Sequence, residues 1–339
     1  MAGPTSFSVY TLPEKIKGIS DTLCADIAIL RLLKEKGRME LGRGGDGFEF
    51  LVRVRAGNVG GAASDFATGS AQTVRPTEKC AATYAAYLWK LQQSMLQLDR
   101  NKYADNTAKL AEQQDEDLNA IMQEALERIG RHCYGDAATY LTGDVAGVQL
   151  ITGLEALILA SGTYFGLARA TYTSLNSQVV ACANPSSWDS ADQSNLVRDM
   201  ETLWNQCSGG KSAAADGISK DIAGSKVEPD FIITTQTRFE VFSKVVSSQQ
   251  QYVGETSDPA KKRAFHGVAL EWDTFCTANR LYMGNSKHLA LRVVGPQLLR
   301  KLAAVDTVNP VAHVDVIGAQ CELYSRNPRY LGKLTITGS

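Results

Sequence analysis

The sequence lacks an excess of charge of either sign. Its 35 lysine and arginine residues nearly balance 36 aspartate and glutamate residues, for a formal net charge of -1 at pH 7. Sequence-independent DNA binding requires many lysine and arginine side chains facing the phosphates. The basic run 261–263 is short and typical of a solvated loop. A protein that grips nucleic acid tightly is therefore not expected.

Long apolar runs and closely spaced cysteine pairs are also missing. The most apolar segment, 156–168, is shorter than a bilayer span and is flanked by Glu155 and Arg169. The N-terminus has no basic start followed by an apolar stretch, so no signal peptide is expected. The 7 cysteines are scattered and form no C-x-x-C pair, which suits a reducing compartment. These features predict a soluble protein of the cytosol.

Motifs of the common enzyme classes are incomplete. Gly42, Gly44 and Gly47 have the order G-x-G-x-x-G, but a helical pattern precedes them and a strand pattern follows, the reverse of a dinucleotide site. Residues 210–212 match the end of a phosphate-binding P-loop, yet Asn205 stands where its first glycine is required. The 4 histidines are far apart, and no G-x-S-x-G elbow occurs. The sequence therefore predicts no catalytic residues, no cofactor and no metal site.

The patterns that are present begin with a helix and an extended arm. Apolar residues recur at helical spacing from Leu23 to Leu33, and Gly37 ends that pattern. In 48–54, apolar side chains alternate with polar ones, as in a half-buried strand. A segment of small residues and a return strand at 82–91 complete a long β-ribbon. Such a ribbon buries too little to be stable alone, so we expect it to lie on its own body or on another subunit.

The clearest helix covers 104–135. Leu118, Met122 and Ile129 belong to an apolar stripe along one side of it. Acidic residues lie toward its start and arginines toward its end, which the helix dipole favours. Adjacent carboxylates such as Glu116 and Asp117 point in different directions, so they indicate a solvated face and not a metal site. At about 1.5 Å per residue, this helix is long enough to act as a spine.

From 148 to 288 the pattern changes to mixed helices and strands. Apolar residues at helical spacing over 196–203 indicate one helix. A buried strand at 231–233 runs into a second helix, where Thr237 and Glu240 have capping-box spacing. Strand patterns then return, and the last two flank an Asn-Pro turn near the C-terminus. The sequence shows no internal repeat.

This order of elements resembles that of the major capsid proteins of tailed bacteriophages. Residues 30–50 look like that family's entry into an extended arm, and 162–177 look like its segment near the start of the axial lobe. Residues 229–242 and 265–289 are similar to its strand-helix unit and its later strand pair. In that pair, four residues stand at the familiar places: Asp273, Asn279, Tyr282 and Asn285. None of these motifs is catalytic, so the likeness lies in their order and spacing across nearly the whole chain.

The resemblance implies an α+β protein with the Hong Kong type of phage major capsid fold. It implies five parts: an N-terminal arm and helix at 1–45, an extended β-arm (E-loop) at 46–92, a peripheral domain or lobe with the long spine helix at 93–147, an α/β axial domain or lobe at 148–288, and closing strands, mainly of the peripheral domain, at 289–339. It also implies a structural protein, not an enzyme, that forms the hexamers and pentamers of an icosahedral head around double-stranded DNA. This virion capsid would be made and assembled in the cytoplasm of a host bacterium.

Contacts between subunits are expected from the arm and from the spine helix. The expected contact residues are Arg53, Arg55, Asp65, Phe66, Glu116 and Asp117. Each contact is modest, but a subunit leaves a shell only when its several interfaces break together. A near-zero net charge also suits close packing around DNA without holding the genome fast.

Two departures from the family pattern bear on the expected partners. Some relatives join subunits covalently through a lysine of the arm, but no lysine occurs from Val52 to Glu78. Noncovalent arm contacts are therefore expected, and a separate decoration protein is a candidate for reinforcing them. The first structured helix is expected to begin near Ser20, so a scaffold protein, if the shell uses one, is expected to be a separate chain. A portal protein is a further expected partner, and no membrane is.

Three other functions stay open at this point. An encapsulin-like nanocompartment would share the fold but enclose cargo enzymes, and co-purifying nucleic acid or nearby portal and terminase genes would distinguish the two. A cytosolic α/β enzyme predicts a small, uniform oligomer that its substrate stabilises. A nucleic-acid-binding module is disfavoured by the charge balance.

Overall fold

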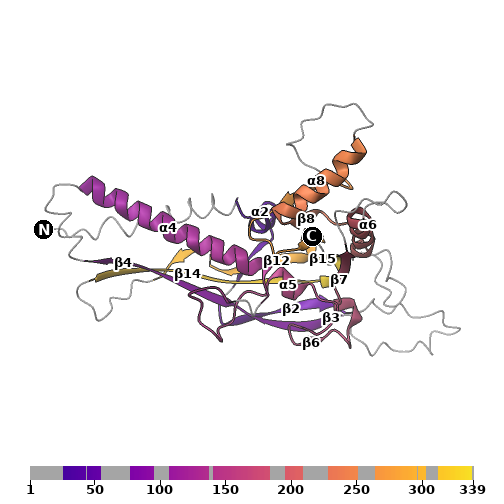
Figure 1. The fold of residues 1–339 in the computed structure, drawn as a ribbon. Coiled ribbons are helices and arrows are strands. Elements are labelled where there is room, and N and C mark those ends of the chain that lie inside the picture. The colour runs from indigo at the N-terminus through magenta and orange to yellow at the C-terminus, as the bar shows by residue number, and fades with distance from the viewer. Residues whose placement is uncertain are drawn as a thin grey trace, which may run out of the picture.

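The chain folds into an elongated molecule with a long helix at one end and a helix-covered sheet at the other (Figure 1). This architecture is taken from a computed structural model. The described residues are 26–42, 44–54, 77–94, 107–136, 140–183, 195–208, 228–250, 264–295, 297–302 and 312–337. The segments 210–212 and 261–263 lie outside them, as does 55–76, the middle of the predicted arm.

A five-stranded sheet forms the body beneath the long helix. Its strands are β1 (Met39–Gly42), β4 (Ala85–Ser94), β12 (Leu289–Val294), β13 (Arg300–Lys301) and β14 (Ala312–Ser325). β14 pairs with β4 in antiparallel register from Ala312 opposite Ser94 to Cys321 opposite Ala85. The helix α4 (Thr107–Tyr134) contacts β4 and buries the predicted apolar stripe. The predicted long helix is therefore present, and it begins at Thr107.

A six-stranded mixed sheet forms the other end of the molecule. Its order is β7 (Gln178–Ala183), β15 (Leu331–Thr337), β11 (Arg280–Gly284), β8 (Phe231–Thr234), β10 (Val268–Trp272) and β9 (Ala264–Phe265). Its helices are α6 (Asn195–Cys207) and α8 (Gln236–Gln250). α8 begins before the predicted capping box, since Phe239 already donates its N–H to the Thr235 carbonyl. Thr237 therefore lies in the first turn of the helix and is not the N-cap, in agreement with helix propensity, which allows a slightly earlier start.

The two sheets share the C-terminal segment. β12 and β14 lie in the five-stranded sheet, whereas β15 pairs with β11 and β7 in the six-stranded sheet. Between β14 and β15 the chain reverses at Asn327 and the short 3-10 helix Pro328–Tyr330, as the Asn-Pro turn predicted. The segment 289–339 therefore contributes strands to both ends of the molecule.

The predicted return strand at 82–91 is divided between two strands. β3 (Thr77–Thr83) pairs with β2 (Gly47–Arg53) in an antiparallel ribbon. At Tyr84 the chain leaves this ribbon, and from Ala85 onward β4 pairs with β14. Only part of the predicted β-arm is thus a free ribbon, because its second strand continues into the body.

A strand, and not the predicted helix alone, precedes the G-x-G-x-x-G pattern. β1 runs parallel to β12 directly before the glycines, and its alternation over four residues is too short to stand out in the sequence. Gly44 and Gly45 then turn the chain, each with φ of 91°, into β2. No helix follows the glycines, so the pattern lacks the N-terminus that a dinucleotide phosphate requires.

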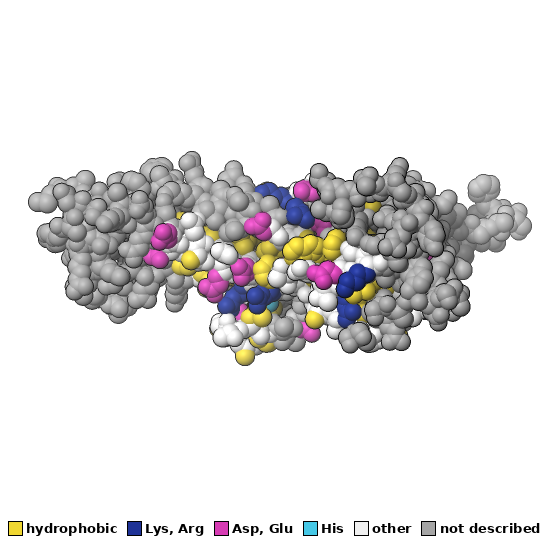
Figure 2. All heavy atoms as spheres, turned by 45° about the horizontal axis from the view of Figure 1, so that its top comes forward, with side chains coloured by type: hydrophobic (Ala, Val, Ile, Leu, Met, Phe, Trp, Pro, Cys, Tyr) yellow, Lys and Arg dark blue, Asp and Glu magenta, His cyan; other side chains and the backbone are white. Residues whose placement is uncertain are grey.

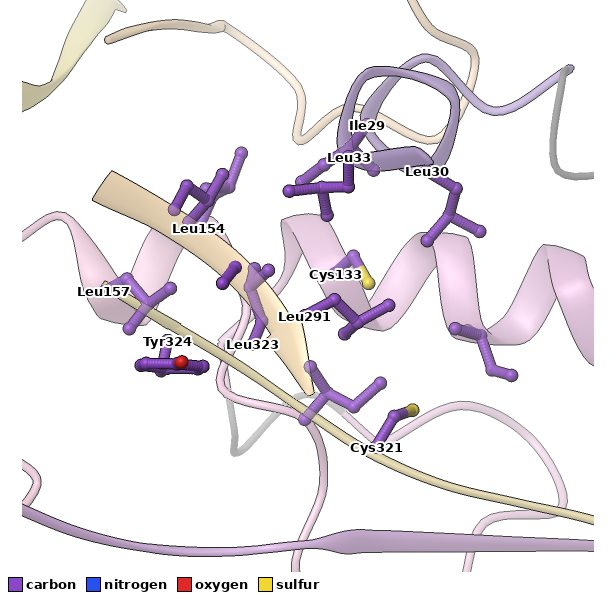
Figure 3. Packing of buried hydrophobic residues seen from close by; sticks show 14 of the residues in the cluster. Ile29, Leu30, Leu33, Cys133, Leu154, Leu157, Leu291, Cys321, Leu323 and Tyr324 are labelled. Carbon is purple, nitrogen blue, oxygen red and sulfur yellow. The ribbon is translucent and has the colours of Figure 1, made fainter. Parts of the chain in front are cut away.

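Two hydrophobic clusters form the interior. The larger cluster joins α4, the five-stranded sheet, the ribbon and α2 (Ala28–Glu35). Just after α2, Gly37 adopts φ of 63°. In Figure 3, Ile29, Leu30 and Leu33 of α2 project toward Cys133 of α4 and toward the strands. The second cluster packs α6 onto the six-stranded sheet. Smaller elements complete the structure: α5 (Leu154–Leu157), β5 (Thr163–Tyr164), β6 (Leu167–Ala168) and the 3-10 helices Thr173–Leu175 and Ser286–His288.

Candidate functional site

The β2–β3 ribbon has one buried face and one exposed face. Phe50 and Val52 face inward and are buried, whereas Leu51 between them keeps 58% of its surface exposed. Beside Leu51, the Lys79 ammonium donates to the Glu49 carboxylate over 3.0 Å. Both groups are largely exposed, so this ion pair adds little to the stability of the subunit. The outer face combines an exposed apolar side chain with a charge pair, which suits a protein–protein contact.

Aromatic side chains fix the base of the ribbon to its own body. The Phe50 ring centroid lies 4.6 Å from that of Tyr324 on β14 and 5.4 Å from that of Phe165. The Arg292 guanidinium lies 4.6 Å from the Phe48 ring centroid, within range of a cation–π contact. The ribbon is therefore a rigid extension of the five-stranded sheet.

The turn between β5 and β6 packs against the base of the ribbon through Phe165. Phe165 has φ of 41°, a left-handed conformation that bulky residues rarely adopt. Its ring meets Phe50 and Tyr164 edge-on, which compensates for the backbone strain. The Ser174 hydroxyl also donates to the Val54 carbonyl over 2.7 Å at the end of the ribbon.

A buried arginine ties the surrounding loop together. Arg169 is fully buried and donates to the carbonyls of Leu157, at 2.7 Å, and Leu159, at 2.8 Å. Burial lowers the pKa of Arg169 to about 10, so the guanidinium remains charged at neutral pH. It also lies over the Tyr164 ring at 5.0 Å. Carbonyl oxygens and an aromatic face thus replace the water that this cation would otherwise bind.

A charged network fixes the loop that follows α4. The Arg128 guanidinium donates to Asp144 Oδ1 over 2.7 Å, and the backbone N–H of Leu141 donates to Asp144 Oδ2 over 2.6 Å. His132 Nε2 lies 3.1 Å from the same carboxylate, although this contact lacks hydrogen-bond geometry. On its other side, His132 Nδ1 is 2.9 Å from the Tyr87 hydroxyl. One carboxylate therefore holds the loop, the helix and, through His132, strand β4.

A second buried carboxylate completes the N-terminus of α2. No side chain of the Ile27 N-cap is available to the first turn, and Asp273 instead accepts from the Ala28 N–H over 2.7 Å. Tyr134 of α4 donates its hydroxyl to the same oxygen over 2.8 Å. Burial and the Asp273 carboxylate keep the pKa of Tyr134 well above its ordinary value. Asp273 thus joins α2, α4 and the loop after β10.

Two further residues that carry the capsid resemblance have local structural roles. Asn279 adopts φ of 58°, and its side-chain carbonyl accepts from Arg238 over 2.6 Å. Asn285 caps the short 3-10 helix by accepting from the Lys287 N–H over 2.9 Å. These residues shape loops next to β11 and show no arrangement of the kind that performs catalysis.

Glu155 of α5 collects three donors from the six-stranded sheet. The Tyr282 hydroxyl donates over 2.9 Å, the Lys333 ammonium over 2.8 Å and the Arg280 guanidinium over 3.2 Å. Lys333 is buried, so its charge depends on this carboxylate. α5 packs into the larger cluster, and the network therefore connects the two ends of the molecule.

Glu322 on β14 is fully buried, and among the described residues its hydrogen bonds come from Thr152. Thr152 donates its N–H to Glu322 Oε1 over 3.1 Å, and Oε2 has no hydrogen-bond partner there. Burial raises the pKa of Glu322 to about 8, so the carboxyl group is mostly protonated at neutral pH. In the described part of the chain, no cation is close enough to offset this effect of burial.

The predicted contact residues lie on two separate surfaces. Arg53 ends β2 and is partly buried, while Glu116 and Asp117 are exposed on α4. In Figure 1 the ribbon and α4 lie on opposite sides of the five-stranded sheet, so the structure does not bring them together. Arg55, Asp65 and Phe66 lie outside the described residues. Leu51 was not predicted, although an apolar residue on the polar face of an alternating strand was visible in the sequence.

The described surface carries no strong charge patch on the face shown in Figure 2, where basic and acidic side chains lie interspersed around a strip of apolar ones. Within the described residues, no three His, Cys, Asp or Glu side chains are placed to hold a metal ion. No helix in the described part of the chain is long and apolar enough to cross a membrane.

No protein-family model and no curated protein matches the sequence. Solved structures do match it in fold. A protein of the cyanophage A-1(L) capsid is 14% identical with a TM-score of 0.58, over 91% of each chain. A capsid protein of a native GTA particle is 13% identical with a TM-score of 0.53, again over 91% of each chain.

The capsid of the Myoviridae phage XM1 gives a third match, at 13% identity and a TM-score of 0.52, over 90% of this chain and 92% of that one. Such low identities establish a common fold and nothing finer. The chain has the α+β fold of these capsid proteins across nearly its whole length, as the order of elements predicted.

Proposed function

We propose that this chain is the major capsid protein of a tailed bacteriophage. It assembles into hexamers and pentamers of an icosahedral head that encloses double-stranded DNA, and it has no enzymatic role. The observation that carries this proposal is the fold match with capsid proteins over about nine-tenths of both chains. The proposed partners are further copies of the chain, a portal protein, a separate scaffold protein and a decoration protein. Assembly takes place in the host cytoplasm, and the product is the virion shell.

The surfaces described above support a protein that works by contact. The ribbon is fixed at its base and exposes Leu51 on its outer face, and its two strands flank the segment 55–76, which is rich in small residues. Buried polar groups such as Arg169, Asp273 and Glu155 are engaged in loop and helix contacts, which suits a structural role. The division into peripheral domain, axial domain and extended arm remains part of this proposal.

The test is negative-stain electron microscopy with light scattering on the full chain, across salt and protein concentration. Closed shells, tubes or capsomer rings are the expected products. A small, uniform oligomer that never assembles, even with neighbouring phage genes co-expressed, would contradict the proposal. Shells that enclose a cargo enzyme and never DNA would instead indicate a nanocompartment.

A further inference from the structure

The loop after α4 brings three exposed apolar side chains close together in the sequence. We call residues 140–148 the valine loop. Val145 keeps 69% of its surface exposed, Val148 42% and Tyr140 40%. Side chains of this kind are usually buried, so three of them within nine positions require an explanation.

The valine loop is held in one conformation. Leu141 accepts the N–H of Asp144 over 2.9 Å, and Val145 accepts that of Val148 over 3.3 Å, which makes two consecutive turns. The Tyr140 hydroxyl closes them by donating to the Val148 carbonyl over 3.1 Å. The Asp144 carboxylate, bound by Arg128, fastens the loop to α4. A surface that is already ordered loses little conformational entropy when a partner binds it.

The exposed part of the valine loop carries no charge. Its one ionised side chain, Asp144, is nearly buried and is paired with Arg128. This matters for the choice of partner, because residues that lie on a rotation axis come next to their own copies. At such a place a charged side chain would be repelled by its own copy, whereas two valine side chains would bury apolar surface against each other. The ribbon differs, since its outer face presents the Glu49–Lys79 pair and suits a surface unlike itself.

We propose that the valine loop is a contact between copies of this chain, at which identical loops meet around a symmetry axis of the assembly. This inference rests on the proposed self-assembly and adds to it the place and the symmetry of one interface. The partner is a second copy of the same loop, with Val145 at the centre.

The test uses Val145→Cys in the full chain and a short bis-maleimide cross-linker. If identical loops meet, the introduced thiols lie close to each other, and assembled protein yields covalently linked subunits. Labelling of the introduced thiol by a monofunctional maleimide is expected to be lost on assembly. The matched control is Val179→Cys on β7, whose side chain is 39% exposed and which the proposed contact does not include. Unmodified protein controls for the native cysteines.

Three results would overturn the inference. Shells that form without cross-links, with the introduced thiol still fully labelled, leave the proposed function intact and remove this contact. A thiol that is protected but never cross-linked places the loop against an unlike surface, such as a decoration protein. A chain that does not assemble at all removes both proposals, and electron microscopy of the same samples separates that case from the first two.

Discussion

His132 has an environment that opposes protonation. Burial lowers the pKa of His132 below its ordinary value of 6.5, and Arg128 adds to this effect, while Asp144 opposes it. The Ile151 N–H donates to the Tyr87 hydroxyl, so that hydroxyl is free to donate to His132 Nδ1. A proton on Nδ1 would break this arrangement. The neutral imidazole is therefore part of the folded structure.

The sign of the pH dependence follows from this shift. Above pH 6.5 His132 is neutral in both states, and its contacts contribute fully to stability. As the pH falls below 6.5, the unfolded chain takes up a proton that the folded chain resists, so stability is lost down to the lowered pKa. We expect His132→Gln to be less stable than the parent by about 1–2 kcal/mol at pH 7.5. This difference should shrink at pH 5.5.

Urea unfolding of both proteins at the two pH values measures this difference. His266→Gln is the matched control, because His266 is exposed and contacts Glu201 at the surface. It should change the unfolding free energy less at pH 7.5. If the difference in unfolding free energy between His132→Gln and the parent is the same at both pH values, protonation of His132 is not coupled to folding.

Glu322 gives the stability of the subunit a pH dependence opposite to that from His132. Its ordinary pKa of 4.5 applies to the unfolded chain, and burial raises the folded value to about 8. Between these values the unfolded chain releases a proton that the folded chain keeps, so the stability falls as the pH rises and levels off above 8. We expect Glu322→Gln, which mimics the protonated acid, to remove this decline and to stabilise the subunit at pH 8. Thermal unfolding between pH 5 and 8.5 tests it, and an unchanged pH profile would mean that Glu322 is ionised in the fold.

At the scale of elements, the ribbon separates stability from contact on neighbouring residues. Phe50 packs on Tyr324, so Phe50→Ala is expected to lower the unfolding free energy by about 3–5 kcal/mol. Leu51 faces outward, so Leu51→Ala should change the same quantity by less than about 0.5 kcal/mol. Leu51→Asp should weaken assembly, which light scattering measures. Equal destabilisation by Phe50→Ala and Leu51→Ala would contradict the assigned faces of β2.

Elements with a strong local pattern were predictable from the sequence. The stripe containing Met122 identified α4, and the alternation around Phe50 identified β2. Both patterns could be recognised because the hydrophobic periodicity of a helix or a strand is visible within a short window of the sequence. β1 was missed because four residues carry too little pattern. The break at Tyr84 was missed because it arises when β4 pairs with β14, a strand more than two hundred positions away in the sequence.

The groups that hold the elements together were not predictable for the same reason. Asp273 accepts a hydrogen bond from the first turn of α2, and Glu155 accepts one from the six-stranded sheet. In both cases the partners are far apart in the sequence. A lone carboxylate has no spacing signal, so its partners become known only in three dimensions. The residues that contact a neighbouring subunit could not be identified from the sequence. The chain has several polar surfaces, and the local sequence pattern does not distinguish a solvated face from an interface.

At the scale of the whole molecule, the question is how its two ends act as one body. The two hydrophobic clusters have separate helices, yet β11 and β15 carry the donors that converge on Glu155 of α5. A buried ammonium without its carboxylate is costly, which makes this junction sensitive to a single change. The junction is therefore a candidate for the element that couples the two ends.

We expect Glu155→Ala to lower the stability of the six-stranded sheet by about 3–5 kcal/mol, because Lys333 is left buried and unpaired. Native-state hydrogen exchange should then show the amides of β11 and β15 opening well before those of β14, whereas the parent protects them more evenly. Adding Lys333→Met removes the unpaired charge and should restore much of the protection, which a general packing defect would not allow. If Glu155→Ala instead weakens both sheets equally, the two ends are coupled through their shared strands and not through this carboxylate.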